Sequence, residues 1–135
     1  MASEFTGGCL CGAVRYRATA MLRADLCHCR MCQKASGAPV VAWFTLPIES
    51  FRFTTGAPLT YRSSAEAIRH FCGTCGSPLT FRLAENPKEI DVNLATLDHP
   101  ELVVPQGHIF TSSQMPWLHI ADDLPRHKEA RPPRL

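Results

Sequence analysis

The sequence predicts a mainly β fold, a single domain of short antiparallel sheets with little helix. Three observations support this prediction. Apolar and polar residues alternate over several short segments, turn-forming residues separate these segments, and the seven cysteines of the 135-residue chain fall into small groups. A chain of this length can bury a core without disulfides, so we expect residues 1–124 to form one domain.

The expected strands follow from the two-residue period of a half-buried strand. Segment 13–18 alternates Val14 and Tyr16 with arginines, which places the two apolar side chains on one face. Segment 39–46 is almost continuously apolar, which is typical of a central strand. The other candidate strands are 50–53, 59–62, 67–72, 78–84 and 89–95.

One short helix is expected, from about Arg30 to Ala35, and Gly37 is expected to end it. Residues 125–135 are basic and rich in proline, so we expect a flexible tail there.

The composition excludes several classes of function. The hydrophobic fraction of 45% and the charged fraction of 19% are ordinary for a globular protein. A net charge of +2 is too small to indicate nucleic acid or an anionic membrane as partner, and no apolar run is long enough to span a bilayer. The N-terminal stretch contains Glu4 and lacks an apolar centre, so we expect no secretory signal and a cytoplasmic protein. The sequence leaves the oligomeric state open.

The cysteines indicate metal binding. Their number is odd, so complete pairing would leave one thiol, and reducing cytosol disfavours disulfides. Clustered cysteines in such a compartment typically bind metal. The clusters are Cys9 with Cys11, Cys27 with Cys29 and Cys32, and Cys72 with Cys75.

The two outer pairs predict a structural zinc site. If residues 7–12 are extended, Cys9 and Cys11 present both sulfurs on one side. Cys72 and Cys75 form a C-x-x-C turn with a glycine after each cysteine, which lets backbone N–H groups approach the sulfurs. Together the four thiolates complete a tetrahedral zinc site that joins the N-terminal segment to the middle of the chain.

Two other interpretations of these cysteines are weaker. Four buried thiols without metal would not explain two paired clusters. A redox C-x-x-C normally begins a helix after a strand, whereas strand signals flank this one on both sides and Pro78 follows closely.

The central cluster predicts a second zinc site with a different role. Cys27 and Cys29 share a face if extended, and Cys32 returns to them through one turn. Three thiolates leave the fourth position of zinc for water or substrate, as in a catalytic centre. His28 would point away from the sulfurs. Alternatively, a histidine from elsewhere in the chain supplies the fourth zinc ligand and makes the site structural. The candidates are His70, His108 and His119.

Four segments resemble one known family. "GGCLCGAVRY", "CHCRMCQKASGAP", "FCGTCGSPLTFR" and "HIFTSSQMPWLHIADDLPRH" are similar to the glutathione-dependent formaldehyde-activating enzymes, a family that includes centromere protein V. The resemblance covers about Gly7 to His127. It implies a folded-over β architecture, the β-tent, related to a guanine-nucleotide exchange factor, with two zinc ions per chain. It also implies structural zinc on the outer cysteines and catalytic zinc on Cys27, Cys29 and Cys32.

The resemblance also implies an activity. The family adds glutathione to formaldehyde and gives S-hydroxymethylglutathione, so we expect a zinc-dependent carbon–sulfur lyase that acts on a small-molecule thiol and an aldehyde. Either the zinc holds the thiolate or it polarises the aldehyde oxygen; the sequence leaves both routes open. Ser36 and Gly37 are expected either to line the glutathione pocket or only to end the helix. His108 is expected either to join that pocket as an acid or base or to be structural.

The alternative to an enzyme is a zinc-binding module for glutathione or a protein partner. The centromere-protein branch of the family suggests it, and only the short segment after Leu124 resembles a partner-binding extension.

Overall fold

The structure, a computed structural model, describes residues 4–132, and within them ten strands form two sheets. The smaller sheet has the order β1 (Phe5–Gly8), β2 (Arg15–Ala18) and β5 (Phe51–Thr55). The larger has the order β10 (His108–Ile109), β3 (Arg23–Cys27), β4 (Val41–Pro47), β9 (Glu89–Asn93), β8 (Pro78–Leu83), β7 (Ala67–Phe71) and β6 (Leu59–Arg62). The neighbouring strands of these sheets are antiparallel, apart from the parallel pair β10 and β3. The prediction of a mainly β, mainly antiparallel fold is therefore confirmed.

Helical structure is sparse, as expected. The predicted helix is α1 (Arg30–Ser36), and Gly37 ends it in the left-handed conformation at φ 75°. With seven residues α1 is far too short to cross a bilayer, and no helix in the described part of the chain is long and apolar enough to do so. The remaining helices are single 3₁₀ turns: η1 (Ile48–Ser50), η2 (Leu94–Thr96), η3 (Pro100–Leu102) and η4 (Thr111–Ser113).

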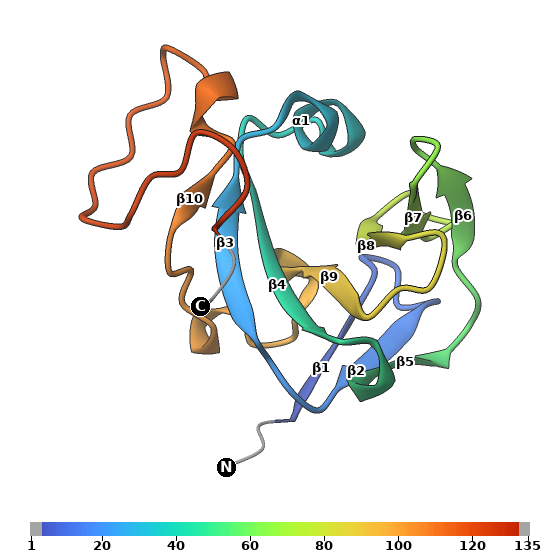
Figure 1. Ribbon diagram of the computed structural model, residues 1–135. Helices are drawn as coiled ribbons and strands as arrows, with labels where there is room; N and C mark the ends of the chain where they lie inside the picture. The colour runs from blue at the N-terminus through green and yellow to red at the C-terminus, as the bar shows by residue number, and fades with distance from the viewer. Residues whose placement is uncertain (1–3, 133–135) are drawn as a thin grey trace.

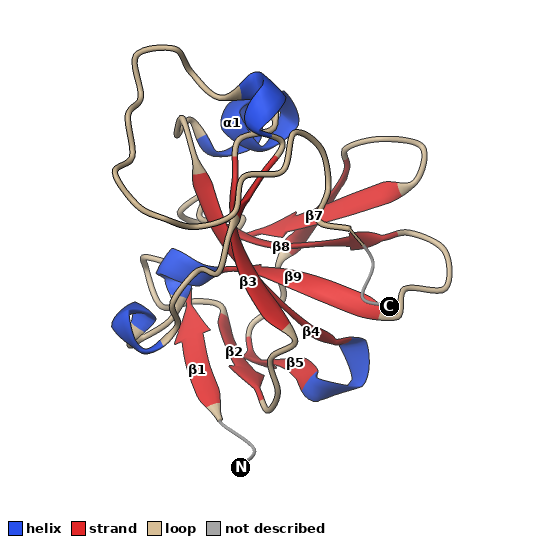
Figure 2. Ribbon diagram, turned by 60° about the vertical axis from the view of Figure 1, so that its left-hand side comes forward, coloured by secondary structure: helices blue, strands red, loops and turns tan. Residues whose placement is uncertain are grey.

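The smaller sheet and α1 lie at opposite ends of the molecule (Figure 1). The strands of the larger sheet fan out between these ends, and long loops surround α1 (Figure 2). The end that carries α1 also carries the central cysteines, because α1 begins directly after Cys29.

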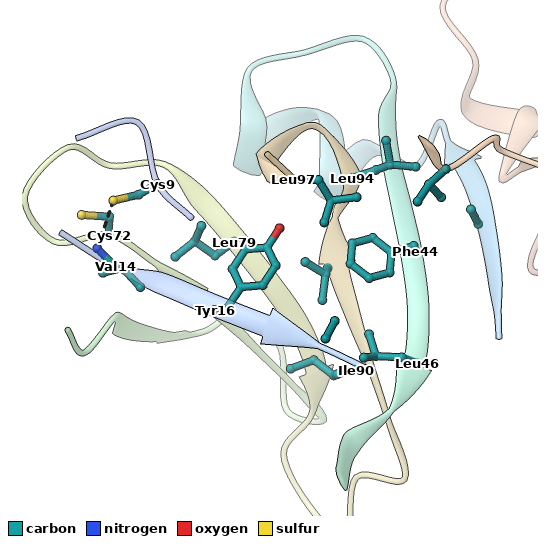
Figure 3. Close-up of a cluster of buried hydrophobic side chains, with 14 residues drawn as sticks. Cys9, Val14, Tyr16, Phe44, Leu46, Cys72, Leu79, Ile90, Leu94 and Leu97 are labelled. Atoms are coloured by element: carbon teal, nitrogen blue, oxygen red, sulfur yellow. Dashed lines mark hydrogen bonds between the residues drawn. The ribbon is translucent and has the colours of Figure 1, made fainter. Parts of the chain in front are cut away.

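The core lies between the two sheets. Tyr16 of the smaller sheet and Phe44, Leu79 and other residues of the larger sheet are almost fully buried in one cluster (Figure 3). The Tyr16 hydroxyl is hydrogen-bonded to Thr96 Oγ1 at 2.8 Å. A Cβ atom at Gly7 would lie 2.4 Å from that hydroxyl, so only glycine fits opposite Tyr16 in β1. Burial of these side chains supplies the main stabilisation of the fold.

The segment expected as a flexible tail is instead bound to the fold. We call residues 125–132 the C-terminal strap; residues 133–135 lie outside the described part of the chain. His108 N donates to Pro125 O at 2.8 Å, and Phe110 N donates to Glu129 O at 2.9 Å. Arg131 forms an ion pair with the buried Asp25. The strap thus contacts the fold where a flexible tail was expected, because the backbone beside β10 and a buried carboxylate both need partners.

Candidate functional site

The four outer cysteines meet where β1 and β7 end. Cys9 and Cys11 lie in the loop from β1 to β2, and Cys72 and Cys75 in the turn from β7 to β8. The sulfurs of Cys9 and Cys11 are 3.6 Å apart, and those of Cys11 and Cys72 are 3.8 Å apart. The first pair lies in a turn, with Gly12 N donating to Cys9 O at 3.2 Å, and not in an extended run. The expected extended geometry was wrong because the chain must reverse there to pair β1 with β2.

This outer group has the geometry of a tetrahedral thiolate site. Its four sulfurs all lie within 4.8 Å of one another, and a tetrahedral ion with Zn–S near ~2.3 Å would separate sulfurs by ~3.8 Å. Val14 N donates to Cys9 Sγ at 3.2 Å, and Thr74 N and Cys75 N donate to Cys72 Sγ at 3.4 Å. These donors stabilise thiolate charge. The residues present fit a metal ion.

Ser77 joins the two halves of the outer group. Its hydroxyl accepts a hydrogen bond from Leu10 N at 3.0 Å and lies 3.2 Å from Cys75 Sγ. The hydroxyl contact lowers the pKa of Cys75 to about 5, which favours the thiolate needed by a metal.

The three central cysteines meet between β3 and α1. Cys27 ends β3, Cys29 caps α1, and Cys32 lies in its first turn. Cys32 N donates to Cys29 Sγ at 3.2 Å, and the sulfurs of Cys27 and Cys32 are 3.7 Å apart. The three sulfurs all lie within 4.8 Å of one another. The helix start therefore folds the sequence C-x-C-x-x-C into a compact trio of sulfurs.

The trio concentrates negative charge on its most exposed member. Hydrogen bonds from the sulfurs of Cys27 and Cys32 lower the pKa of Cys29 to about 2, whereas the contact with Cys29 raises the pKa of Cys27. Cys27 and Cys32 are buried and Cys29 is partly exposed. Within residues 4–132 no histidine, aspartate or glutamate joins the trio as a fourth ligand. A metal here would have three protein ligands.

Two cavities meet beside Cys32. The larger, of about 890 Å³, is lined by all three central cysteines together with Phe81, and by Arg131 of the C-terminal strap. The smaller, of about 620 Å³, lies between α1 and the strands β7 and β8. Both cavities share four lining residues: Met31, Cys32, Trp43 and Arg69. The site is thus open to a small molecule from either side of Cys32.

His108 is buried and does not line either cavity in the described chain. Its Nδ1 is 2.8 Å from Nε2 of His28, and its Nε2 is 2.8 Å from Oδ2 of Asp122. Both ring nitrogens of His108 are therefore used inside the fold, which favours the structural alternative over a place in the glutathione pocket. His28 is not part of the cysteine group, and its Nε2 contacts His108 instead. The contact with His108 lowers the pKa of Asp122.

The two residues that follow the central cysteines differ in their positions. Ser36 lines the smaller cavity, and its hydroxyl donates to Cys32 O at 2.8 Å and accepts from Ala38 N at 3.1 Å. Gly37 lines neither cavity and ends α1. Of the three expected pocket residues, the structure therefore places only Ser36 beside a cavity.

Two residues that the sequence did not indicate contact the central cysteine site and the chain around it: Gln33 and Arg69. Gln33 is buried, and its Nε2 donates to the carbonyl oxygens of His28, Pro39 and Ser113. Arg69 Nη2 donates to Cys32 Sγ at 3.6 Å. The sequence carries no local signal for the contact of Arg69 with Cys32 or for that of Gln33 with Ser113, because these partners lie on other elements.

Comparison with known proteins supports one assignment. The family model described as "Glutathione-dependent formaldehyde-activating enzyme" matches residues 4–113. A crystal structure of a Rhodobacter sphaeroides protein is similar to this chain, with a TM-score of 0.58 and 29% sequence identity. That similarity covers 69% of this chain and 87% of the other. The match of the family model includes all seven cysteines. The chain belongs to the family of glutathione-dependent formaldehyde-activating enzymes.

Proposed function

We propose that this protein is a zinc-dependent carbon–sulfur lyase that adds glutathione, or a similar thiol, to formaldehyde or a related aldehyde. One observation carries the proposal: the three central sulfurs converge without a fourth ligand among residues 4–132, and they open on a cavity of about 890 Å³. A site with three protein ligands is typical of catalytic zinc, whereas a site with four is typical of structural zinc. Membership of the family supports the thiol and aldehyde as substrates.

Two zinc ions per chain are part of the proposal. Sulfur-only ligand sets favour zinc over the harder divalent ions. Cys9, Cys11, Cys72 and Cys75 would hold the structural ion, and Cys27, Cys29 and Cys32 would hold the catalytic one. When bound in the central site, zinc supplies a positive charge that favours the reactive thiolate of the substrate.

The chain's own residues would bind and orient the substrates. In the reaction a carbon–sulfur bond forms, the π bond of the aldehyde breaks, and the thiol proton ends on the aldehyde oxygen. Trp43, Met31 and Phe81 give the larger cavity apolar walls beside the sulfurs, which limits water at the reacting atoms. All seven cysteines are free, which accords with the cytoplasmic location that we propose.

The test is a product-resolved assay with isotopically labelled formaldehyde and several thiols on fully metallated protein. The uncatalysed reaction is subtracted with a metal-free control. We expect the Cys29→Ala variant to hold one metal ion per chain in place of two and to lose turnover. Wild-type turnover with the central metal absent would contradict the proposal. Two bound metals that glutathione leaves unperturbed, without turnover above background, would favour the binding module.

A further inference from the structure

Arg69 contacts the sulfur of a central cysteine and an aromatic ring, and it lines both cavities. It lies on β7 opposite Phe81 of β8, so both side chains lie on the same face of the sheet. Its guanidinium carbon is 5.0 Å from the centre of the Phe81 ring, and its Nη2 donates to Cys32 Sγ at 3.6 Å. The side chain lines both cavities. A fixed positive charge therefore lies between the sulfur trio and the space open to ligands.

The outer cysteine group has no such neighbour. Among the described residues, its sulfurs receive hydrogen bonds from backbone amides, from each other and from the Ser77 hydroxyl, and from no cationic side chain. Among the described residues, an arginine hydrogen-bonded to a cysteine sulfur is found only at the central site, although Arg15 interacts electrostatically with Cys9 of the outer group. The smaller cavity, lined by Lys34, Arg69 and His70, has no carboxylate in its described lining, whereas four arginines and four carboxylates line the larger cavity.

We propose that Arg69 makes the central cysteine site prefer a thiolate over a neutral ligand. This inference rests on the proposed metal site of the three central cysteines. Three thiolates and one divalent cation carry a net charge of −1, and an incoming thiolate raises it to −2. The guanidinium offsets that charge, because a hydrogen bond from an ionised donor is stronger than one from a neutral donor. Its contact with Phe81 fixes it there, as a cation over an aromatic ring. Arg69 is a specificity-determining residue in this proposal.

The experiment uses full-length protein loaded with two cobalt(II) ions, whose absorption reports ligand exchange. The probes are 2-mercaptoethanol, which binds as a thiolate with no other charge, and imidazole, which binds neutral. In the Arg69→Gln variant we expect the Kd of the thiol to rise about ten- to a hundredfold, the range for losing a charged hydrogen bond. We expect the Kd of imidazole to stay within about twofold.

Matched variants separate charge from packing. The Arg82→Gln variant removes the same charge from β8, where Arg82 donates to Leu83 O and lines neither cavity, and should bind both probes as wild type does. The Arg69→Lys variant keeps the positive charge but lacks the planar guanidinium group, and it should retain most of the preference for the thiol. If Arg69→Gln fails to hold two cobalt ions, Arg69→Lys decides: a retained preference supports the proposal and a lost one overturns it.

Equal weakening of thiol and imidazole in Arg69→Gln would mean that Arg69 only packs the site, and unchanged binding of both would mean that it has no role. Either result overturns the inference. The proposed function is tested separately. If thiol binding depends on Arg69 but the protein does not turn over aldehyde, the inference about Arg69 stands and the proposed enzymatic activity is contradicted.

Discussion

Gln33 offers a sharp test of how the fold holds the central cysteines. Its Nε2 donates to His28 O at 2.9 Å, to Pro39 O at 3.1 Å and to Ser113 O at 3.2 Å. The three carbonyls come from the cysteine loop, from the segment after α1 and from η4. One buried amide thus ties three pieces of chain to the helix that carries Cys32.

The Gln33→Met variant keeps the length of the side chain and removes its donors. The amide has two hydrogens, so about two net hydrogen bonds are lost at about 1 kcal/mol each, and a buried carbonyl is left without this donor at about 1 kcal/mol or more. We expect the free energy of unfolding to fall by about 2 to 4 kcal/mol in urea denaturation at saturating zinc. We also expect faster release of metal from the central site to a chelator, with release from the outer site unchanged.

Arg30→Met is the matched control for Gln33→Met. It removes the 2.8 Å hydrogen bond from Arg30 Nη1 to Gln33 Oε1, but Arg30 is exposed, so we expect a loss below about 1 kcal/mol. If Gln33→Met unfolds within about 0.5 kcal/mol of wild type and releases metal at the wild-type rate, the carbonyl contacts of Gln33 do not hold the site.

Three further predictions address the surrounding fold. Burial raises the pKa of Asp91 from 3.8 to about 6. Ionisation of Asp91 therefore lowers the free energy of unfolding progressively between these two pH values, fully above about 6 and not at all below 3.8. Asp91→Asn should therefore gain about 1 to 3 kcal/mol over wild type as pH rises from about 4 to about 7 in urea denaturation; a difference independent of pH would contradict this. Arg131→Met leaves the buried carboxylate of Asp25 unpaired and should lower the free energy of unfolding by about 1 to 3 kcal/mol. Adding Asp25→Asn should restore part of that loss, and no restoration would argue against the ion pair. Leu79→Ala deletes a side chain with 0% exposure and should cost about 2 to 5 kcal/mol in thermal denaturation, whereas a cost below about 1 kcal/mol would mean that the core closes over the gap.

The fold was predictable where the local pattern matched the burial. Alternation identified the strands β2, β8 and β9, and the apolar run identified β4, which pairs with strands on both sides. The strands β1, β3 and β10 were not predicted. Half of β1 is glycine, because Tyr16 leaves no room for a side chain at Gly7. β3 carries a buried aspartate whose cation lies 106 residues further along the chain. β10 has only two residues, too few for a period.

The site was predictable only in its ligands. The spacing of the cysteines indicated two groups, and the structure brings the sulfurs of each group together. The contacts around them depend on tertiary structure: His28 and His108 are 80 residues apart in sequence, and Arg69 is 37 residues from Cys32. Gln33 and Ser113 are also 80 residues apart. No local pattern links such partners, so only the folded chain reveals them.

The C-terminal strap has a practical consequence for handling this protein. Ala130, Arg131 and Pro132 form part of the wall of the larger cavity, whereas Phe5, near the other end of the chain, lies in the smaller sheet. A purification tag or reporter fused at this end of the chain would follow a segment that lines the cavity proposed to bind the substrates. Histidines in such a tag would also compete for a metal ion bound by the three central cysteines. The smaller sheet, which contains β1, lies at the end of the molecule opposite α1 (Figure 1), so the amino end is the better place for a fusion.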